Sequence, residues 1–198
     1  NFFTDISNYV SYETGQPTHC YNCEKVGDKI KLDFIKDNFK FETLVDKTIN
    51  LDDKDLVFIN KYNQVINLAG VMGGKDSACE KSTRSVVIEC AYFSPETILG
   101  KTIKHNINSE AAYKFERNTD PSSHDYVLRR FLKLIEVHTN INNVEIFSEI
   151  SSKPNSIAIP YNLKKINAIL GTKDTNKKLK NYLQNLGFQI TDESIKVP

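Results

Sequence analysis

One stretch of the sequence, from Val65 to Pro121, limits the possible folds more than any other. It begins with a β-rich run and a glycine-rich turn, and it continues with an apolar strand, expected over residues 86–93, that contains Glu89. Strands buried on both faces are typically continuous apolar runs, and an ionised carboxylate is costly there unless it is paired or hydrogen-bonded. Glu89 therefore indicates a binding site, although an internal arginine or backbone amides would also satisfy a buried acid.

The glycine-rich turn has three glycines in five residues: Gly70, Gly73 and Gly74. A backbone without Cβ atoms lets a ligand approach closely, so the turn favours a site near Glu89. A hairpin end that needs positive φ angles would explain a single glycine equally well. The spacing is neither G-x-G-x-x-G nor that of a P-loop, which argues against a nucleotide-binding loop.

The distribution of apolar and turn residues predicts an α+β fold, because strands and helices do not alternate as βαβ units. Strands are expected over residues 29–36, 39–44, 56–60, 64–68, 86–93, 143–150, 157–160 and 188–190. Helices are expected over 4–13 with Thr4 or Asp5 as the cap, over 94–104, from Asp120-Pro121 onward, over 162–170, and from 174 or 175 to 187. The core face of the long helix should be Leu128, Phe131, Leu132 and Ile135, which follow i, i+3, i+4 and i+7.

The 198 residues, 39% of them hydrophobic, suffice for one medium domain and a small one. We place the first at residues 1–152 and the second at 153–198. No apolar run approaches the length of a transmembrane helix. The chain starts at Asn1 and ends in mid-pattern, so we expect it to be a piece of a longer protein.

The four cysteines predict neither a metal site nor a disulfide. Cys20 and Cys23 form a C-x-x-C, but Cys79 and Cys90 are eleven residues apart and do not form the second pair of a zinc ribbon. Reduced cysteines in a cytosolic protein are the simpler interpretation.

Four motifs occur in a fixed order: GQPTHCYN, GVMGG, ECAYFSP and SEAAYKFERNTDP. Together they resemble the editing module of the bacterial phenylalanyl-tRNA synthetase β-subunit family, in which the first motif reads G-Q-P-x-H-A-F-D. The resemblance implies mixed and antiparallel sheets packed with helices, followed by a truncated, winged-helix-like α+β domain. It also implies an activity, the hydrolysis of tyrosine wrongly attached to phenylalanine tRNA, with water as the nucleophile.

The resemblance also assigns roles to individual residues. Glu89 corresponds to the carboxylate that meets the tyrosine hydroxyl, and His19 lies near the scissile ester, where it would be either a general base or a structural hydrogen-bonding group. The remaining substrate-binding residues by resemblance are Ser7 and Asn8 on the first helix, Pro17, Gly70 and Gly73 in the backbone wall, and Ser109 and Ala111 in the pocket. A family arginine is expected just before Asn1. The chain departs from the family pattern at Cys20, Glu110 and Asn118-Thr119.

Physical chemistry supports the role of Glu89 independently. A pocket that admits tyrosine also admits phenylalanine, so size cannot reject the smaller side chain. A buried polar group that stays unpaired without the hydroxyl can discriminate by roughly 10⁴ or more. Glu89 is a group of this kind.

The partners implied by the resemblance are phenylalanine tRNA, the synthetase α subunit in a heterotetramer, and tyrosine as the editing ligand. No membrane and no DNA are expected, and the location is the cytoplasm. Mg²⁺ and ATP belong to the whole enzyme, and no cofactor is expected in this fragment. The alternative function is a non-catalytic scaffold that positions tRNA and bridges the α and β subunits.

Overall fold

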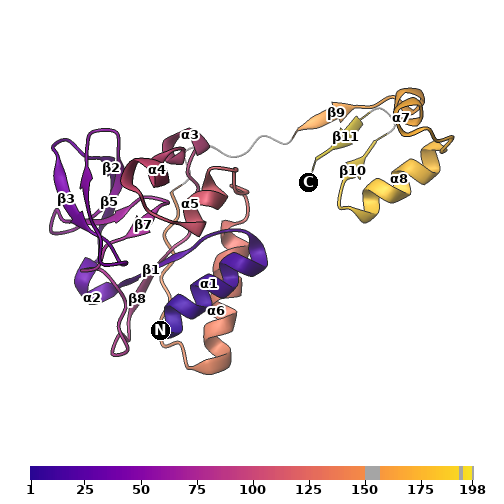
Figure 1. The fold of residues 1–198 in the computed structure, drawn as a ribbon. Coiled ribbons are helices and arrows are strands. Elements are labelled where there is room, and N and C mark those ends of the chain that lie inside the picture. The colour runs from indigo at the N-terminus through magenta and orange to yellow at the C-terminus, as the bar shows by residue number, and fades with distance from the viewer. Residues whose placement is uncertain (150–156, 192–193, 198) are drawn as a thin grey trace. The chain divides into compact units, whose positions relative to one another are not determined.

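The computed structural model describes residues 1–149, 157–191 and 194–197, and it separates into two compact units, Asn1–Phe147 and Ser148–Pro198 (Figure 1). The helices of the first unit are α1 (Phe2–Thr14), α2 (Cys23–Val26), α3 (Pro95–Ile98), α4 (Lys101–His105), α5 (Glu110–Phe115) and α6 (His124–His138). Its strands are β1 (His19–Asn22), β2 (Ile30–Phe34), β3 (Phe39–Glu42), β4 (Thr48–Leu51), β5 (Leu56–Asn60), β6 (Val65–Leu68), β7 (Met72–Gly73) and β8 (Val86–Glu89). The α+β class expected from the sequence is confirmed.

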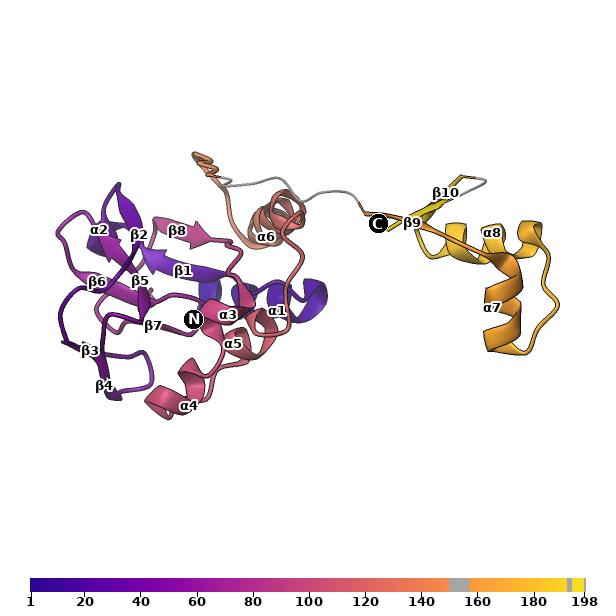
Figure 2. The ribbon, with the colours of Figure 1, turned by 90° about the horizontal axis from the view of Figure 1, so that it is seen from above.

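All strand pairs of the first unit are antiparallel. One sheet has the order β2-β5-β6-β7, β3 pairs with β4, and β1 pairs with β8. The expected hairpin of β5 and β6 is present, with Val57 opposite Leu68. The β1–β8 pair joins two segments that are far apart in the sequence (Figure 2).

The β1–β8 ladder lies between two hydrophobic cores. Side chains alternate between the two faces of a strand, so Tyr21 and Val87 pack into the core of the β-rich layer, while Cys20 and Ile88 pack into a second core. The second core is formed mainly by α1 and α6, which lie side by side (Figure 1).

The buried face of α6 differs from the expected one. Val127, Phe131 and Ile135 are buried, whereas Leu128 and Leu132 are only partly buried. The buried residues are spaced by four, as are Ile6 and Val10 on α1, which is the spacing of the ridges that interlock in helix packing.

Three boundaries expected in the first unit are wrong for local reasons. Asn1, rather than Thr4 or Asp5, caps α1, since its Oδ1 accepts from the Thr4 N–H at 3.2 Å. The helix expected over 94–104 is divided into α3 and α4 by Gly100, whose φ is +79°. The helix α6 begins only at His124, because the Asp120 carboxylate accepts from the backbone N–H of Ser122 at 2.8 Å and forms a turn first.

The strand expected over 86–93 ends at Glu89, and the reason lies in its partner. His19 is opposite Glu89 in the ladder, so continuing the pairing would bring Pro17 opposite Ala91. Proline has no N–H to donate to a ladder. The side-chain Nε2 of Gln16 donates to the Ala91 carbonyl instead, at 2.9 Å.

The strand expected over 143–150 does not form in residues 143–149, and Ile150 lies outside the described residues. The apolar side chains of Val144, Ile146 and Phe147 are exposed. Alternating apolar residues form a strand only where another strand is available to pair with them, and none pairs with this segment in the described part of the chain.

The second unit contains β9 (Ala158–Pro160), α7 (Leu163–Leu170), α8 (Asn176–Asn185), β10 (Gln189–Ile190) and β11 (Ser194–Lys196). Its antiparallel sheet has the order β10-β11-β9. Asn162 caps α7 and Thr175 caps α8, both at expected positions. This order fits the small winged-helix-like α+β domain that the resemblance implies. Among the described helices of the whole chain, none has the length and apolar character needed to cross a membrane.

Candidate functional site

Antiparallel pairing brings His19 and Glu89 together. They are directly opposite each other in the β1–β8 ladder and therefore project from the same face, together with Tyr21. Both side chains are partly buried. No hydrogen bond joins the imidazole to the carboxylate, so the two groups are neighbours rather than a hydrogen-bonded pair.

The Glu89 carboxylate has an internal partner that the sequence did not predict. The Tyr21 hydroxyl donates to Glu89 Oε2, and Asn67 Nδ2 donates to the Tyr21 oxygen at 2.8 Å. Tyr21 is fully buried, in a motif position where the resembling family has phenylalanine. The other carboxylate oxygen, Oε1, accepts no hydrogen bond from a described residue. In the sequence, the tyrosine at this motif position was the only indication that Glu89 has an internal partner. Nothing in the sequence indicated the role of Asn67.

Burial changes the protonation of both predicted catalytic groups. It raises the pKa of Glu89 from the ordinary 4.5 to about 7, while the hydrogen bond from Tyr21 acts in the opposite direction. Burial also lowers the pKa of His19 from 6.5 to about 4. At neutral pH the imidazole is therefore uncharged, and the Glu89 carboxyl group is partly protonated.

The His19 ring is held by its neighbours. Its centroid is 4.5 Å from that of Tyr21, with the rings at 67°, and its Nε2 is buried without a hydrogen-bond partner. A Cβ added to Gly73 would lie 2.4 Å from His19 Cε1 and 2.7 Å from Nε2. Gly73 is therefore required where the backbone approaches the imidazole.

Gly70 has a different structural role. Its φ is +69°, and an added Cβ would lie 2.8 Å from Ile98 Cδ1 and 2.9 Å from the Phe93 ring. Glycine at this position is required both by the turn and by the apolar core. Its contacts are with core side chains rather than with His19 or Glu89.

The segment before His19 is fixed by hydrogen bonds at two points. Gln16, only 1% exposed, donates through Nε2 to the carbonyls of Pro17 and Ala91. Ser7 on α1 donates to the Thr18 carbonyl at 2.7 Å. Pro17 is buried in this segment. Ser7 and Pro17 thus position the chain that leads to His19.

Asn8 lies apart from this group. It is exposed on α1, whereas Ser7 is buried on the same helix. None of the hydrogen bonds in the described part of the chain connects Asn8 to another predicted site residue.

Ser109 links the glycine turn to α5. Its hydroxyl donates to the Val71 carbonyl at 2.6 Å and accepts from the Ala112 N–H at 3.1 Å, which makes it the N-cap of α5. Ala111 is partly buried against the core of the β-rich layer. Both side chains are small, and Ser109 contacts the glycine turn through Val71.

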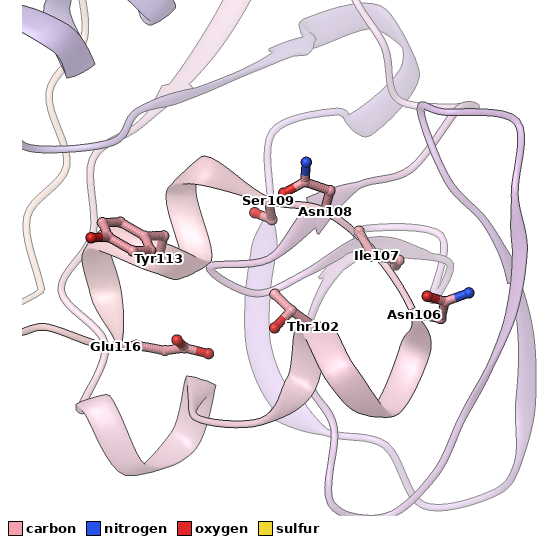
Figure 3. A pocket seen from close by; sticks show the side chains of 7 residues that line it. All are labelled: Thr102, Asn106, Ile107, Asn108, Ser109, Tyr113 and Glu116. Carbon is pink, nitrogen blue, oxygen red and sulfur yellow. The ribbon is translucent and has the colours of Figure 1, made fainter.

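A depression of about 320 Å³ lies beside Ser109, between α4 and α5 (Figure 3). In Figure 3 the side chains of Thr102 and Glu116 point into the space between these helices. Tyr113 also lines this depression and lines a second one, of about 340 Å³, next to Gln16. Neither His19 nor Glu89 lines either of the two.

The cysteines are free, and the described residues contain no cluster of three or more His, Cys, Asp or Glu side chains that could hold a metal ion. Cys20 is buried in the α1–α6 core. Burial raises the pKa of the Cys90 thiol to about 12, so this side chain is an inert thiol at neutral pH.

The α+β unit that carries His19, Glu89 and the glycine turn corresponds to a recognised class of domain. Residues 1–140 match the model of the B3/4 domain. The chain belongs to this family.

Several curated relatives of the chain carry the name phenylalanine–tRNA ligase beta subunit. It is 33% identical over 174 residues to the phenylalanine–tRNA ligase beta subunit of Francisella tularensis, covering 87% of this chain and 22% of the relative. It is 30% identical over 192 residues to the protein of that name from Legionella pneumophila (strain Paris), covering 96% of this chain and 24% of the relative. The resemblance stated from the motifs is confirmed, and the chain spans about a quarter of the length of these relatives.

The chain is also similar to a solved structure. It is an N-terminal fragment of the phenylalanyl-tRNA synthetase beta-subunit from Pyrococcus horikoshii. It is 10% identical, with a TM-score of 0.44, and the match covers 99% of this chain and 59% of that chain.

Proposed function

We propose that this chain hydrolyses the ester that joins tyrosine to phenylalanine tRNA, as the proofreading part of a phenylalanine–tRNA ligase beta subunit. Family membership and the position of Glu89 support this proposal. By the same reasoning, phenylalanine tRNA and an α subunit are its partners in the cytoplasm, and Mg²⁺ and ATP serve the ligation reaction elsewhere in the enzyme. Residues 1–152 would be the editing domain.

One observation carries the proposal: the Glu89 carboxyl accepts a hydrogen bond from a phenol, that of Tyr21. The same chemistry is required to recognise the hydroxyl of a tyrosine ligand. Since Oε1 has no partner among the described residues, it is the atom proposed to accept the ligand hydroxyl. Phenylalanine offers no donor, so its binding would leave this oxygen unpaired.

The proposed nucleophile is a water molecule. His19 is uncharged at neutral pH and its Nε2 has no protein partner, so it can accept a hydrogen bond from water or from the substrate. Its lowered pKa makes it a weak base, which favours a positioning role over full proton abstraction. Ser7, Pro17, Gly70, Gly73, Ser109 and Ala111 would form the surrounding wall, whereas exposed Asn8 would contact only a part of the tRNA outside it.

The test compares tyrosine and phenylalanine as substrates. Glu89→Ala should reduce the ratio of kcat/KM for tyrosyl-tRNA over phenylalanyl-tRNA by about 10- to 100-fold, because a hydrogen bond to a charged group contributes about 1.5–3 kcal/mol. Hydrolysis of mischarged tyrosyl-tRNA and of correctly charged phenylalanyl-tRNA should be measured with the intact ligase. Glu145→Ala, at an exposed acid, is the matched control. An unchanged ratio in Glu89→Ala would show that Glu89 is not the discriminating residue.

A second candidate function is the non-catalytic scaffold. The hydrogen bond from Tyr21 is consistent with this alternative, because it gives Glu89 a structural partner. Under this alternative the wild-type ligase would leave tyrosyl-tRNA intact, while deletion of this domain would weaken tRNA binding or subunit association.

A further inference from the structure

The second depression combines features that the proposed ester site does not use. It has a volume of about 340 Å³ and lies between the end of α1, the end of α5 and the start of α6. Gln16 lines it and is adjacent in sequence to Pro17. The depression is therefore next to the segment that leads to His19.

Two cations line this depression without a close carboxylate partner. Lys114 Nζ donates to the carbonyl and to the hydroxyl of Ser11, each at 2.7 Å, and forms no ion pair with a described carboxylate. Arg117 has only Glu116, at 3.9 Å. Asp120 also lines the depression, but its carboxylate accepts from the N–H and the hydroxyl of Ser122. The charged side chains of the lining are therefore two cations, Lys114 and Arg117, and one carboxylate, Asp120.

Two buried polar atoms beside these cations have no partner. Gln16 is 1% exposed and Thr119 is 8% exposed. Neither Gln16 Oε1 nor Thr119 Oγ1 has a hydrogen-bond partner within the described protein. Buried polar atoms in native proteins usually have partners. Ser123, the N-cap of the 15-residue helix α6, also lines the depression and makes no side-chain capping bond, so the N-terminal dipole of that helix is available to an anion.

An aromatic platform stands at the edge of the depression. Tyr113 is 58% exposed, and the Arg117 guanidinium carbon is 3.5 Å from the centroid of its ring. An exposed aromatic ring beside cations is the usual arrangement for binding single-stranded nucleic acid, because bases stack on the ring while the cations meet the phosphates.

We propose that this depression is a nucleotide subsite, in which Lys114 and the α6 N-terminus bind a phosphate of single-stranded RNA while Tyr113 and Arg117 stack on the neighbouring base. The inference rests on the proposed function, since the natural occupant would be the 3′ end of the tRNA that carries the ester. It adds to that function the residues that hold the RNA.

The experiment measures binding of a fluorescein-labelled tetranucleotide, r(ACCA), to the 198-residue chain over a range of salt concentrations. Tyr113→Leu should weaken binding by roughly tenfold, which lies within the range that stacking on an aromatic ring contributes per base. Lys114→Gln should reduce the slope of log K against log salt by about 0.7, the value for one phosphate contact of a single strand. Inorganic phosphate should compete with the tetranucleotide in the wild type and less well in Lys114→Gln.

Lys40→Gln is the matched control, because Lys40 is exposed on β3 and lines neither depression. Tyr113→Phe keeps the ring and should bind as the wild type does. Comparing it with Tyr113→Leu therefore separates the effect of stacking from any loss of folding. Affinities and salt slopes of Tyr113→Leu and Lys114→Gln equal to those of Lys40→Gln would overturn the subsite. Binding of phosphate with no added affinity for r(ACCA) would overturn its assignment to a nucleotide. If the wild type hydrolyses tyrosyl-tRNA and the variants bind RNA as well as the wild type does, the subsite alone is refuted. If the wild type does not hydrolyse tyrosyl-tRNA but binds RNA as expected, only the proposed function is refuted.

Discussion

Glu89, Tyr21 and Asn67 form a chain of hydrogen bonds in which each residue fixes the next. Asn67 Nδ2 donates to the Tyr21 oxygen, and the Tyr21 hydroxyl donates to Glu89. A carboxylate rotamer is otherwise free to turn, so this chain defines which oxygen is left for a ligand. Tyr21 is in this sense a positioning residue for the proposed site.

Replacing Tyr21 by phenylalanine tests this chain of hydrogen bonds. Tyr21→Phe removes the donor that favours the ionised carboxylate, so the pKa of Glu89 should rise further above its present value of about 7. The free energy of unfolding should fall by about 1–3 kcal/mol, because buried polar atoms lose a partner. A carboxyl-carbon NMR titration and urea unfolding measure the two effects. Tyr12→Phe, at a residue that is 89% exposed, should change neither.

The opposite pKa shifts of Glu89 and His19 predict a specific pH profile of stability. The folded-state pKa of Glu89 is raised, so wild-type stability falls as pH rises from about 4.5 to about 7. The folded-state pKa of His19 is lowered, so stability falls as pH drops from about 6.5 to about 4. The two effects oppose each other between about pH 4.5 and 6.5.

Glu89→Gln should separate the two effects. With the contribution of Glu89 removed and that of His19 retained, stability should rise with pH up to about 6.5, and at pH 8 the variant should exceed the wild type by up to about 3 kcal/mol. Urea unfolding at a series of pH values measures both profiles. Parallel profiles for the two proteins would contradict the raised pKa of Glu89.

At the scale of elements, the short helix α4 depends on one buried acid. Lys101, Lys104 and His105 all contact the Asp55 carboxylate, at 3.0, 2.8 and 3.1 Å. Asp55 is fully buried at the start of β5, and these hydrogen bonds lower its pKa despite its burial. A five-residue helix has little stability of its own, so α4 is held by these contacts.

Removing the charge of Asp55 should therefore release α4. Asp55→Asn is expected to lower the free energy of unfolding by about 3 kcal/mol, since the largely buried Lys101 loses its carboxylate partner and Lys104 keeps only Asp52. Amide hydrogen exchange should increase first in residues 101–105. Asp53→Asn, two positions away and exposed, is the control. Equal protection of α4 in the two variants would refute this role.

Elements with local signals could be predicted from the sequence, and those that depend on distant partners could not. The β5–β6 hairpin and the capped helices α7 and α8 have their turn and cap residues within the segment itself. The end of β8 depends on Pro17, which is far away in the sequence. Residues 143–149 have the pattern of a strand, but no strand among the described residues pairs with them. Similarly, Glu89 was identified from its own strand, while Tyr21 and Asn67 lie 46 positions from each other and meet only after folding.

At the scale of the whole molecule, the chain matches about a quarter of the length of its relatives and consists of two compact units. The first unit contains the proposed ester site and the proposed nucleotide subsite. The hydrogen bonds that define these two sites lie within residues 7–122.

The β1–β8 ladder, with one core on each face, has a consequence for the accuracy of the proposed proofreading. His19 and Glu89 keep their orientation only while the helical layer supports one side of these strands and the β-rich layer supports the other. A molecule that has lost either layer therefore cannot hold the two groups in register. Such a damaged molecule would lose the proposed hydrolysis of tyrosyl-tRNA. It would not hydrolyse correctly charged tRNA instead.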